Sequence, residues 1–230
     1  MLEKYDLENH LFGIKKNVPW SKLRKRNITW WQKVGRKDIK EKPETKRKNY
    51  DVFLEDIKDK TNITLDSIKD ENVGEVCCGP YGGIIQAYDL QCKQKYFIDI
   101  FMDDFKNMKF TQWPDNSVFI NAPCEQIHLE DNCVDTLFGY NSIDHGWDWK
   151  SSIDECLRIS KKMFLMFDTK GKLDKDDHPQ VITHDDVLEY IQQQGWKKKF
   201  QYVLVQARYK DYGYYETRFK WPETWVYVIK

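Results

Sequence analysis

Long apolar stretches and the cysteine spacings of metal sites are both missing from this chain of 230 residues. No run of about 18 apolar residues occurs, and the start MLEKYDLENH lacks the apolar core of an export signal. We therefore expect a cytoplasmic protein with no membrane partner. Six cysteines are present, but none belongs to a C-x-x-C pair, and several lie inside apolar runs where a thiol behaves as a small hydrophobic group. We expect neither a metal site nor a disulfide framework.

The formal net charge of the chain is zero, but the charged residues are distributed unevenly along the sequence. Residues 1–50 carry fifteen Lys and Arg against six Asp and Glu, a net charge of +9, so the remaining residues carry −9. One interpretation is a solvated segment that packs on its own domain. The other is an arm that attracts an anionic small molecule or a nucleic acid. We predict a basic, Trp-containing extension or lid over residues 1–50 and the main domain over residues 51–230.

From residue 72 onward, short apolar runs alternate with helical stretches. Strands are predicted within NVGEVCCG, KYFIDIF, NSVFINA, CVDTLFGYNS, MFLMFDT, FQYVLVQARY and TWVYVIK. Strands that alternate with helices indicate parallel βαβ units, whereas the last two runs have no helix between them and should pair antiparallel. We therefore predict an α/β fold with a doubly wound, seven-stranded, mostly parallel sheet. It has an antiparallel C-terminal strand pair and an N-terminal helical extension.

Two of the predicted helices carry recognisable end signals. The stretch SSIDECLRISKK has a helical apolar pattern, and Ser151 or Ser152 is the predicted N-cap. The stretch THDDVLEYIQQQGW places Thr183 or His184 near the start of a second helix and Gly195 at its end. These signals support the alternation of strands and helices.

The stretch EVCCGPYGG, residues 75–83, follows the first predicted strand and precedes a predicted helix. A glycine-rich turn at this place offers bare backbone and a helix N-terminus to a negatively charged group. Asp99 ends the next predicted strand, twenty residues after Gly79, where an acidic side chain can accept hydrogen bonds from ribose hydroxyls. The two features together indicate a nucleoside cofactor without saying which one.

Five segments, in order and spacing, resemble the class I S-adenosylmethionine-dependent methyltransferases. They are VGEVCCGPYGG, YFIDIF, NAPCEQIHLEDNCVDTLFGYNSIDH, LRISKKMFLMFD and HPQVITHDDVLEYIQQQGW, and they span about residues 72–230. Glu75 and Gly79 match the acidic residue and the middle glycine of the family pattern, whereas Cys77 and Tyr81 stand where glycine is commoner. The resemblance implies an enzyme with S-adenosylmethionine as cofactor and S-adenosylhomocysteine as product.

The resemblance also implies a cofactor site at the ends of the first four strands. Asp99 would hold the ribose hydroxyls, with Ile100 and Phe101 beside the adenine. The implied cofactor-binding residues are Glu75, Cys77, Gly79, Pro80, Tyr81, Gly82, Asp99, Ile100, Phe101, Cys124, Glu125 and Tyr140. The residues themselves leave simpler roles open, because Asp99 can cap the following helix and Glu125 can be a solvated loop acid.

The segment GYNSIDH resembles the part of the family that faces the transferred methyl group and its acceptor. A hydroxyl acceptor needs a base. We predict His145 supported by Asp144, or His178 from the loop after the fifth strand, in that catalytic role. An amine acceptor would need only a polar group to orient it, and both histidines keep purely structural or surface roles as alternatives. The predicted substrate and lid residues are Trp20, Trp30, Trp31, Asn141 and Trp147.

The resemblance therefore implies methylation of a small acceptor, anionic or sugar-like, at oxygen or nitrogen. One alternative is a nucleic-acid methyltransferase, favoured by the basic arm with its interleaved aromatic residues. Against it, GYNSIDHGW differs from the Asn/Asp-Pro-Pro-aromatic motif of amino-directed DNA enzymes. Another alternative is a non-catalytic binding module with the same fold, favoured by the altered glycines. A nicotinamide-dependent oxidoreductase is disfavoured because G-x-G-x-x-G is absent. The sequence indicates neither the exact acceptor nor the oligomeric state.

Overall fold

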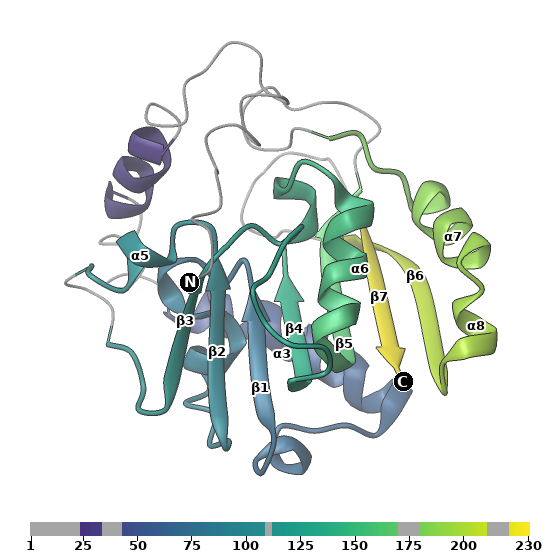
Figure 1. The fold of residues 1–230 in the computed structure, drawn as a ribbon, viewed down its shortest axis with the longest axis horizontal. Helices are drawn as coiled ribbons and strands as arrows, with labels where there is room; N and C mark the ends of the chain where they lie inside the picture. Colours follow the sequence, from purple (N-terminus) through teal and green to yellow (C-terminus); the bar gives the residue numbers. More distant parts are fainter. Residues whose placement is uncertain (1–23, 34–42, 109–111, 170–179, 211–220) are drawn as a thin grey trace.

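A sheet of seven strands with helices on both faces forms the centre of the structure (Figure 1). The computed structural model describes residues 24–33, 43–108, 112–169, 180–210 and 221–230. The strands are β1 (Asn72–Val76), β2 (Gln94–Asp99), β3 (Ser117–Asn121), β4 (Val134–Tyr140), β5 (Ser160–Asp168), β6 (Tyr202–Lys210) and β7 (Trp221–Ile229). Each strand overlaps one of the seven runs predicted from the sequence.

The strand order is β3-β2-β1-β4-β5-β7-β6. Within the group β1 to β5, each strand is parallel to the strands beside it. β7 pairs antiparallel with both β5 and β6. The predicted doubly wound sheet with an antiparallel C-terminal pair is therefore confirmed. The order reverses between β1 and β4. Ligands of doubly wound sheets bind beside such a reversal, at the carboxyl ends of the strands.

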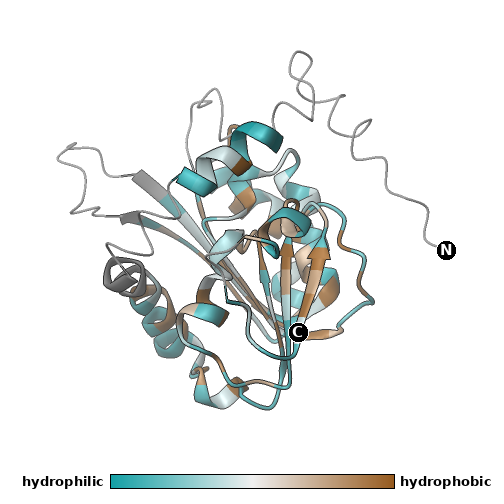
Figure 2. Ribbon diagram, turned by 90° about the vertical axis from the view of Figure 1, so that its left-hand side faces the viewer, coloured by the Kyte–Doolittle hydropathy of each residue, from teal (hydrophilic) through white to brown (hydrophobic). Residues whose placement is uncertain are grey.

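Two layers of helices cover the sheet, and each encloses a hydrophobic core. On one face lie α3 (Pro43–Thr61), α4 (Gly83–Ala87) and α5 (Met102–Phe105), and on the other α6 (Trp149–Ile159), α7 (His184–Gln193) and α8 (Trp196–Lys199). Neighbouring residues of one strand serve opposite cores, as with Leu137 and Phe138 of β4. Figure 2 shows the consequence, apolar strands between helices with hydrophilic outer surfaces. Burial on both faces explains why the strands read as continuous apolar runs.

The start of α7 agrees with the sequence signals. Thr183 is the N-cap, and its side chain and that of Asp186 form a reciprocal capping box. Gly195 follows the helix with a left-handed φ of 65°, which glycine adopts without a steric penalty. The predicted end signals of this helix are confirmed.

The start of α6 differs from the prediction. Asp148 is the N-cap, and its side chain accepts the backbone N–H of Lys150 at 3.1 Å, so neither Ser151 nor Ser152 caps the helix. The first helical residue, Trp149, is buried, and its ring packs edge to face on Tyr190 at a centroid distance of 5.4 Å. Burying this ring against α7 makes the first turn of the helix apolar, which moves the start ahead of the serines.

The predicted boundary between residues 50 and 51 falls inside α3, because this helix runs from Pro43 to Thr61. Phe53 and Ile57 of α3 are buried in the core against the sheet. Residues 24–33 are helical as well, and they lie beside α5 (Figure 1). Within the part of the chain that the structure describes, every helix is too short or too polar to cross a bilayer.

Candidate functional site

The chain turns sharply several times after β1. Cys77, Gly79, Gly82 and Gly83 all adopt left-handed backbone angles, with φ of 52°, 59°, 63° and 54°. This conformation costs roughly 1–2 kcal/mol for a residue with a side chain and little for glycine. The sequence resemblance predicts glycine as the commoner residue at the position of Cys77, and the left-handed φ found there is one that glycine adopts at little cost.

Glu75 lies under the turn and holds it in place. Its carboxylate accepts the backbone N–H of Ile85, in the first turn of α4, at 3.1 Å. A Cβ atom on Gly83 would overlap both carboxylate oxygens of Glu75, so only glycine fits there. Burial raises the pKa of Glu75 to about 8, although backbone hydrogen bonds from Ile84 and Ile85 lower it in part. Direct cofactor contact by Glu75 stays a prediction.

Asp99 ends β2 and joins it to the same turn. Its Oδ2 accepts the N–H of Gly79 at 3.0 Å, and its Oδ1 accepts the N–H of Phe101 at 2.9 Å. Asp99 is 8% exposed, and burial raises its pKa to about 6, against the lowering effect of these hydrogen bonds and of His145. Each carboxylate oxygen keeps a second lone pair. Asp99 can therefore still accept hydrogen bonds from two hydroxyl groups at the carboxyl edge of the sheet.

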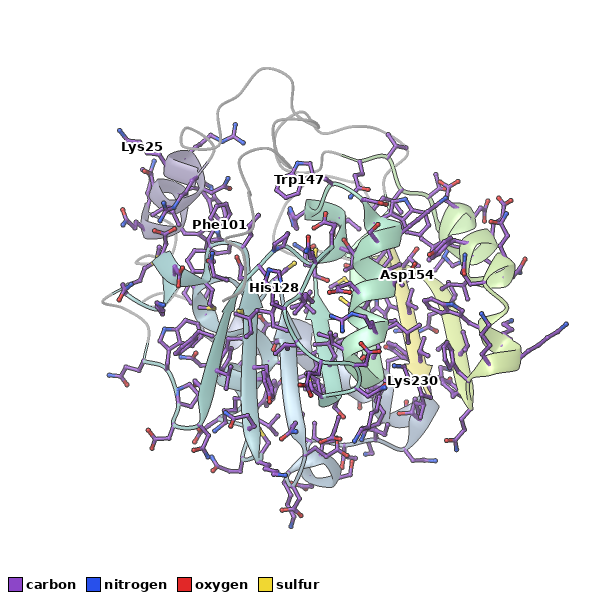
Figure 3. All side chains as sticks on the ribbon, viewed as in Figure 1. Lys25, Phe101, His128, Trp147, Asp154 and Lys230 are labelled. Atoms are coloured by element: carbon purple, nitrogen blue, oxygen red, sulfur yellow. The ribbon has the colours of Figure 1, made fainter. Side chains whose placement is uncertain are left out.

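Phe101 and Trp147 both lie toward the edge of the sheet at which β1 and β4 end (Figure 3). Phe101 directly follows the partly buried Ile100, and its ring packs on Phe105 of α5 at a centroid distance of 5.9 Å. Trp147 is half-buried. Residues that follow β2 and residues of the loop before α6 therefore lie at this edge.

Glu125, in the loop after β3, binds backbone rather than standing free in solvent. Its Oε1 accepts the N–H of Trp147 at 2.6 Å and that of Asp148 at 3.2 Å. The same oxygen would lie 2.8 Å from a Cβ on Gly146. Glu125 thus fixes the loop that leads into α6, and its predicted role at the adenine stays a prediction.

Cys124 brings the loop after β3 close to the turn after β1. A hydrogen bond with Cys124, together with burial, raises the pKa of the Cys77 thiol well above its usual value. The Cys124 Sγ also lies 3.4 Å from the hydroxyl of Ser152. All six cysteines of the chain carry free thiols. In the described ranges, no three His, Cys, Asp or Glu side chains are grouped so as to hold a metal ion.

The helical segment 24–33 lies directly on the turn after β1. The Trp31 ring is 3.7 Å from the position that a Cβ on Gly79 would take. Its centroid lies 5.8 Å from that of Tyr81 and 6.1 Å from that of Phe105, edge to face in both pairs. Pro80, between Gly79 and Tyr81, is buried. The structure thus brings the predicted lid residue Trp31 onto the predicted cofactor turn.

An ion pair fastens this segment to α5. Arg24 donates two hydrogen bonds to the carboxylate of Asp104, at 2.7 and 2.8 Å. Trp30 is 52% exposed and packs on Trp31 with ring centroids 4.7 Å apart. Trp20 lies outside the described residues. The function of this segment as a lid stays a prediction.

The chain after β4 groups three of the predicted acceptor-side residues. β4 ends at Tyr140, and Asn141 then takes a left-handed φ of 54°. The side-chain amide of Asn141 lies 3.2 Å from His145 Nε2, and Asp144 Oδ2 lies 3.9 Å from the same nitrogen. Asp144 is buried, whereas the His145 side chain is 39% exposed. An accessible imidazole between an amide and a carboxylate can accept a proton.

The two halves of the site are close enough for their charges to interact. A positive charge on His145 lowers the pKa of Asp99, so the end of β2 and the loop after β4 share one electrostatic environment. His178, the other predicted base, lies outside the described residues. Of the two predicted bases, the structure therefore describes His145, which lies at the candidate site.

Tyr50 of α3 belongs to this site, although the sequence did not suggest it. Its ring centroid lies 4.9 Å from that of Tyr140, at an angle of 86°. Burial raises the pKa of its hydroxyl, and so do the nearby Glu75, Cys78 and Tyr88. Tyr50 thus stands between the β1 turn and the end of β4. The helical apolar spacing of residues 50–61 signals a buried helix face, but not which end of the sheet the helix covers.

Comparison with known proteins identifies the fold. No protein-family model matches the chain, and no curated protein matches it. The plantazolicin methyltransferase BpumL, solved in complex with S-adenosylhomocysteine, matches with a TM-score of 0.56 and 10% identity, over 90% of each chain. The YcgJ protein from Bacillus subtilis matches with a TM-score of 0.51 and 11% identity, over 71% of this chain and 93% of that one.

A third solved structure is assigned as a methyltransferase of an antibiotic biosynthesis pathway in Anabaena variabilis ATCC 29413. It matches with a TM-score of 0.50 and 13% identity, over 69% of this chain, which spans 65% of the length of that protein. Identities this low show the fold alone. With the strand order described above, these similarities identify the fold of the chain as that of the class I S-adenosylmethionine-dependent methyltransferases.

Proposed function

We propose that this protein transfers a methyl group from S-adenosylmethionine to a hydroxyl group of a small, anionic or sugar-like acceptor. One observation carries the proposal: two different loops meet where the strand order reverses. The loop after β1 is a left-handed turn with a buried carboxylate, Asp99, beside it. The loop after β4 holds the accessible His145 between Asn141 and Asp144. This pairing suits a nucleoside cofactor on one side and a proton-bearing acceptor on the other.

The residues present fit the cofactor. Asp99 would hold the ribose hydroxyls, because its oxygens keep lone pairs at the carboxyl edge. The backbone of residues 79–82 would border the methionine part, because Gly79 and Gly82 take left-handed angles and carry no side chain that would block the cofactor. When bound, the cofactor supplies a methyl group on a positively charged sulfur. The protein then has to align the acceptor, exclude water and take up a proton.

His145 is the group that would take up this proton. The amide nitrogen of Asn141 donates toward Nε2, so the neutral ring carries its hydrogen on Nδ1 and keeps the Nε2 lone pair. An acceptor hydroxyl that replaces the Asn141 contact can pass its proton to Nε2. Asp144 Oδ2, 3.9 Å away and buried, stabilises the resulting imidazolium. A base of this kind contributes roughly 10²- to 10⁴-fold to a rate.

The charge of the N-terminal segment supports an anionic acceptor. Residues 24–33 carry no Asp or Glu, and their cations are Arg24, Lys25, Arg26 and Lys33. Arg24 is bound to Asp104, whereas Lys25 and Lys33 are exposed. A positive surface beside the β1 turn raises the local concentration of anionic molecules.

Binding and transfer measurements on the full chain test this function. Calorimetry should show binding of S-adenosylmethionine and S-adenosylhomocysteine and none of NAD. Asp99→Asn should weaken the binding of both by about tenfold or more, whereas the exposed acid variant Asp103→Asn should not. Transfer of a labelled methyl group should then occur to sugar or nucleotide-sugar hydroxyls.

Three outcomes would contradict the proposal. Binding of NAD without binding of S-adenosylmethionine would remove the donor. Transfer to amines alone would remove the role of His145 as a base. Transfer to RNA, with steeply salt-dependent binding, would replace the small acceptor by a nucleic acid.

A further inference from the structure

Two tyrosine rings stand where the strand order reverses. Tyr140 is the last residue of β4, the strand paired with β1 at the centre of the sheet. Tyr50 reaches it from α3, with ring centroids 4.9 Å apart and planes at 86°. Phe53 packs behind Tyr140 at 5.7 Å and is fully buried. The pair therefore has a rigid apolar backing on one side and the carboxyl edge of the sheet on the other.

Several contacts hold Tyr50 in this position. The next residue, Asp51, accepts a hydrogen bond from the hydroxyl of Tyr88, which follows α4. Phe53, one helical turn on, packs edge to face on Trp225 and Tyr227 of β7, at 5.3 and 5.9 Å. Anchors after α4 and at β7 fix the middle of α3 beside the end of β4.

The carboxylate of Glu75, whose charge acts on Tyr50, is committed elsewhere. Glu75 is 2% exposed, and its side chain is directed at the backbone N–H of Ile85 under the turn. Asp99, at the end of β2, accepts the N–H groups of Gly79 and Phe101. The rings of Tyr50 and Tyr140 are both partly exposed, and the faces of aromatic rings are electron-rich. Aromatic faces attract cations within about 6 Å of the ring centroid.

We infer that Tyr50 and Tyr140 recognise the positive charge on the cofactor sulfur, so that the site prefers S-adenosylmethionine to the uncharged S-adenosylhomocysteine. This inference rests on the proposed function. It assigns a specificity-determining role to α3, an element outside the segments that carry the family resemblance. The same preference favours exchange of product for fresh cofactor, because the attraction disappears once the sulfur has lost its methyl group.

Binding constants for the two ligands test the inference without any need for an acceptor. Calorimetry on the full chain gives the ratio of the two dissociation constants for wild type and variants. Tyr50→Leu should weaken S-adenosylmethionine by about 5- to 30-fold and S-adenosylhomocysteine by less than about twofold. Tyr50→Phe should keep the wild-type ratio, because it keeps the ring. Tyr140→Leu should shift the ratio in the same direction as Tyr50→Leu.

Tyr202→Leu is the matched control. Tyr202 begins β6 and pairs with Ile229, at the opposite end of β7 from the site, yet it packs against the same hydrophobic core. The Tyr202→Leu variant loses the same kind of ring at a comparable cost to packing. Its ratio of dissociation constants for S-adenosylmethionine and S-adenosylhomocysteine should equal that of wild type. If Tyr50→Leu does not fold, Tyr140→Leu and Tyr50→Phe carry the comparison.

The outcomes separate this inference from the function on which it rests. Equal weakening of both ligands in the ring-deleted variants would overturn it, because the rings would then be a neutral wall. A Tyr50→Phe variant that loses the preference as fully as Tyr50→Leu would also overturn it, because the hydroxyl would be the recognising group. Failure of wild type to bind either ligand would overturn the proposed function itself.

Discussion

β1 and β4 lie side by side at the centre of the sheet and leave it through the same backbone conformation, yet they lead into chemically different loops. Cys77 after β1 has φ 52°, and Asn141 after β4 has φ 54°. In the β1 loop the nearby carboxylate of Glu75 is buried and holds the backbone. In the β4 loop His145 stays accessible. A left-handed residue at the same place in each loop thus has two different consequences. After β1 it begins a turn of glycine-rich backbone, and after β4 it leads to the accessible side chain of His145.

The β1 side depends most strictly on the absence of a side chain. In Gly83→Ala the new Cβ would overlap the Glu75 carboxylate, and φ 54° is left-handed as well. We expect the free energy of unfolding to fall by about 3–5 kcal/mol. Urea unfolding of the purified variant gives this value.

Gly195→Ala separates the two causes. Gly195 has a similar φ of 65°, but beyond its own chain neighbours no atom lies within 4 Å of the position that its Cβ would take. Its substitution should therefore cost about 1–2 kcal/mol, the conformational part alone. Equal losses in the two variants would show that the Glu75 contact contributes nothing, and the contrast between the two loops would lose its main support.

The β4 side should behave in the opposite way, with a large effect on rate and little on stability. His145→Gln should lower methyl transfer by about 10²- to 10⁴-fold. Its free energy of unfolding should stay within about 0.5 kcal/mol of wild type, because the side chain is 39% exposed. Steady-state transfer to whichever hydroxyl acceptor wild type uses provides the measurement.

His128→Gln is the control for this variant. His128 is exposed, and it lies away from the edge of the sheet at which Trp147 lies (Figure 3). Its transfer rate should match that of wild type. If His145→Gln transferred methyl groups at the wild-type rate, His145 would not be the base. The proposed chemical difference between the β4 loop and the β1 loop would then be wrong.

The buried acid beneath the β1 loop, Glu75, should make stability depend on pH. Burial raises the pKa of Glu75 to about 8 in the folded state, against 4.5 for an ordinary glutamate. The folded protein therefore holds this proton more tightly, so wild type should lose stability as pH rises from about 4.5 to 8. The loss should approach about 1.4 kcal/mol per pH unit at its steepest.

Glu75→Gln removes this titration, because its amide cannot lose a proton in this range. The difference in free energy of unfolding between wild type and Glu75→Gln, measured from pH 5 to 8.5, should change steadily in favour of the variant. Asp99 contributes equally to both proteins and cancels. A difference that stays constant with pH would mean that Glu75 is solvated in the folded protein.

The strands and the fold could be predicted because their determinants are local. Leu137 and Phe138 of β4 face opposite cores, so the strand reads as an unbroken apolar run. The cap at Thr183 and Asp186 needs only residues three apart. Features of this range are written in a short window of sequence.

The interior of the site could not be predicted, because it depends on contacts between distant residues. Tyr50 meets Tyr140 across ninety residues of chain. Glu75 can point toward α4 only because Gly83 has no Cβ atom. The sequence does not show this contact, because it forms only when the turn brings Gly83 over Glu75. The position of the α6 N-cap at Asp148 likewise follows from the burial of Trp149 against another helix. Sequence places such residues near the site without fixing their partners.

The smallest expected effects compare the two left-handed residues directly. In Cys77→Gly, release of a strained φ stabilises by about 1–2 kcal/mol, and the added freedom of the unfolded chain removes roughly 0.5–1 kcal/mol of that gain. The free energy of unfolding should therefore rise by up to about 1.5 kcal/mol. In Asn141→Gly the gain is smaller, because asparagine tolerates this conformation, so stability should fall by about 0.5 kcal/mol.

The two variants should also differ in function, in a way that urea unfolding cannot show. Asn141→Gly removes the amide that lies 3.2 Å from His145 Nε2, so methyl transfer should slow by less than in His145→Gln. Cys77→Gly brings the turn closer to the glycine-rich pattern that the sequence resembles, and it should leave cofactor affinity unchanged or improved. Opposite signs in stability would show that left-handed backbone is a strain at Cys77 and a natural setting at Asn141. A single sign for both would mean that packing around the side chains, rather than backbone conformation, decides what each loop tolerates.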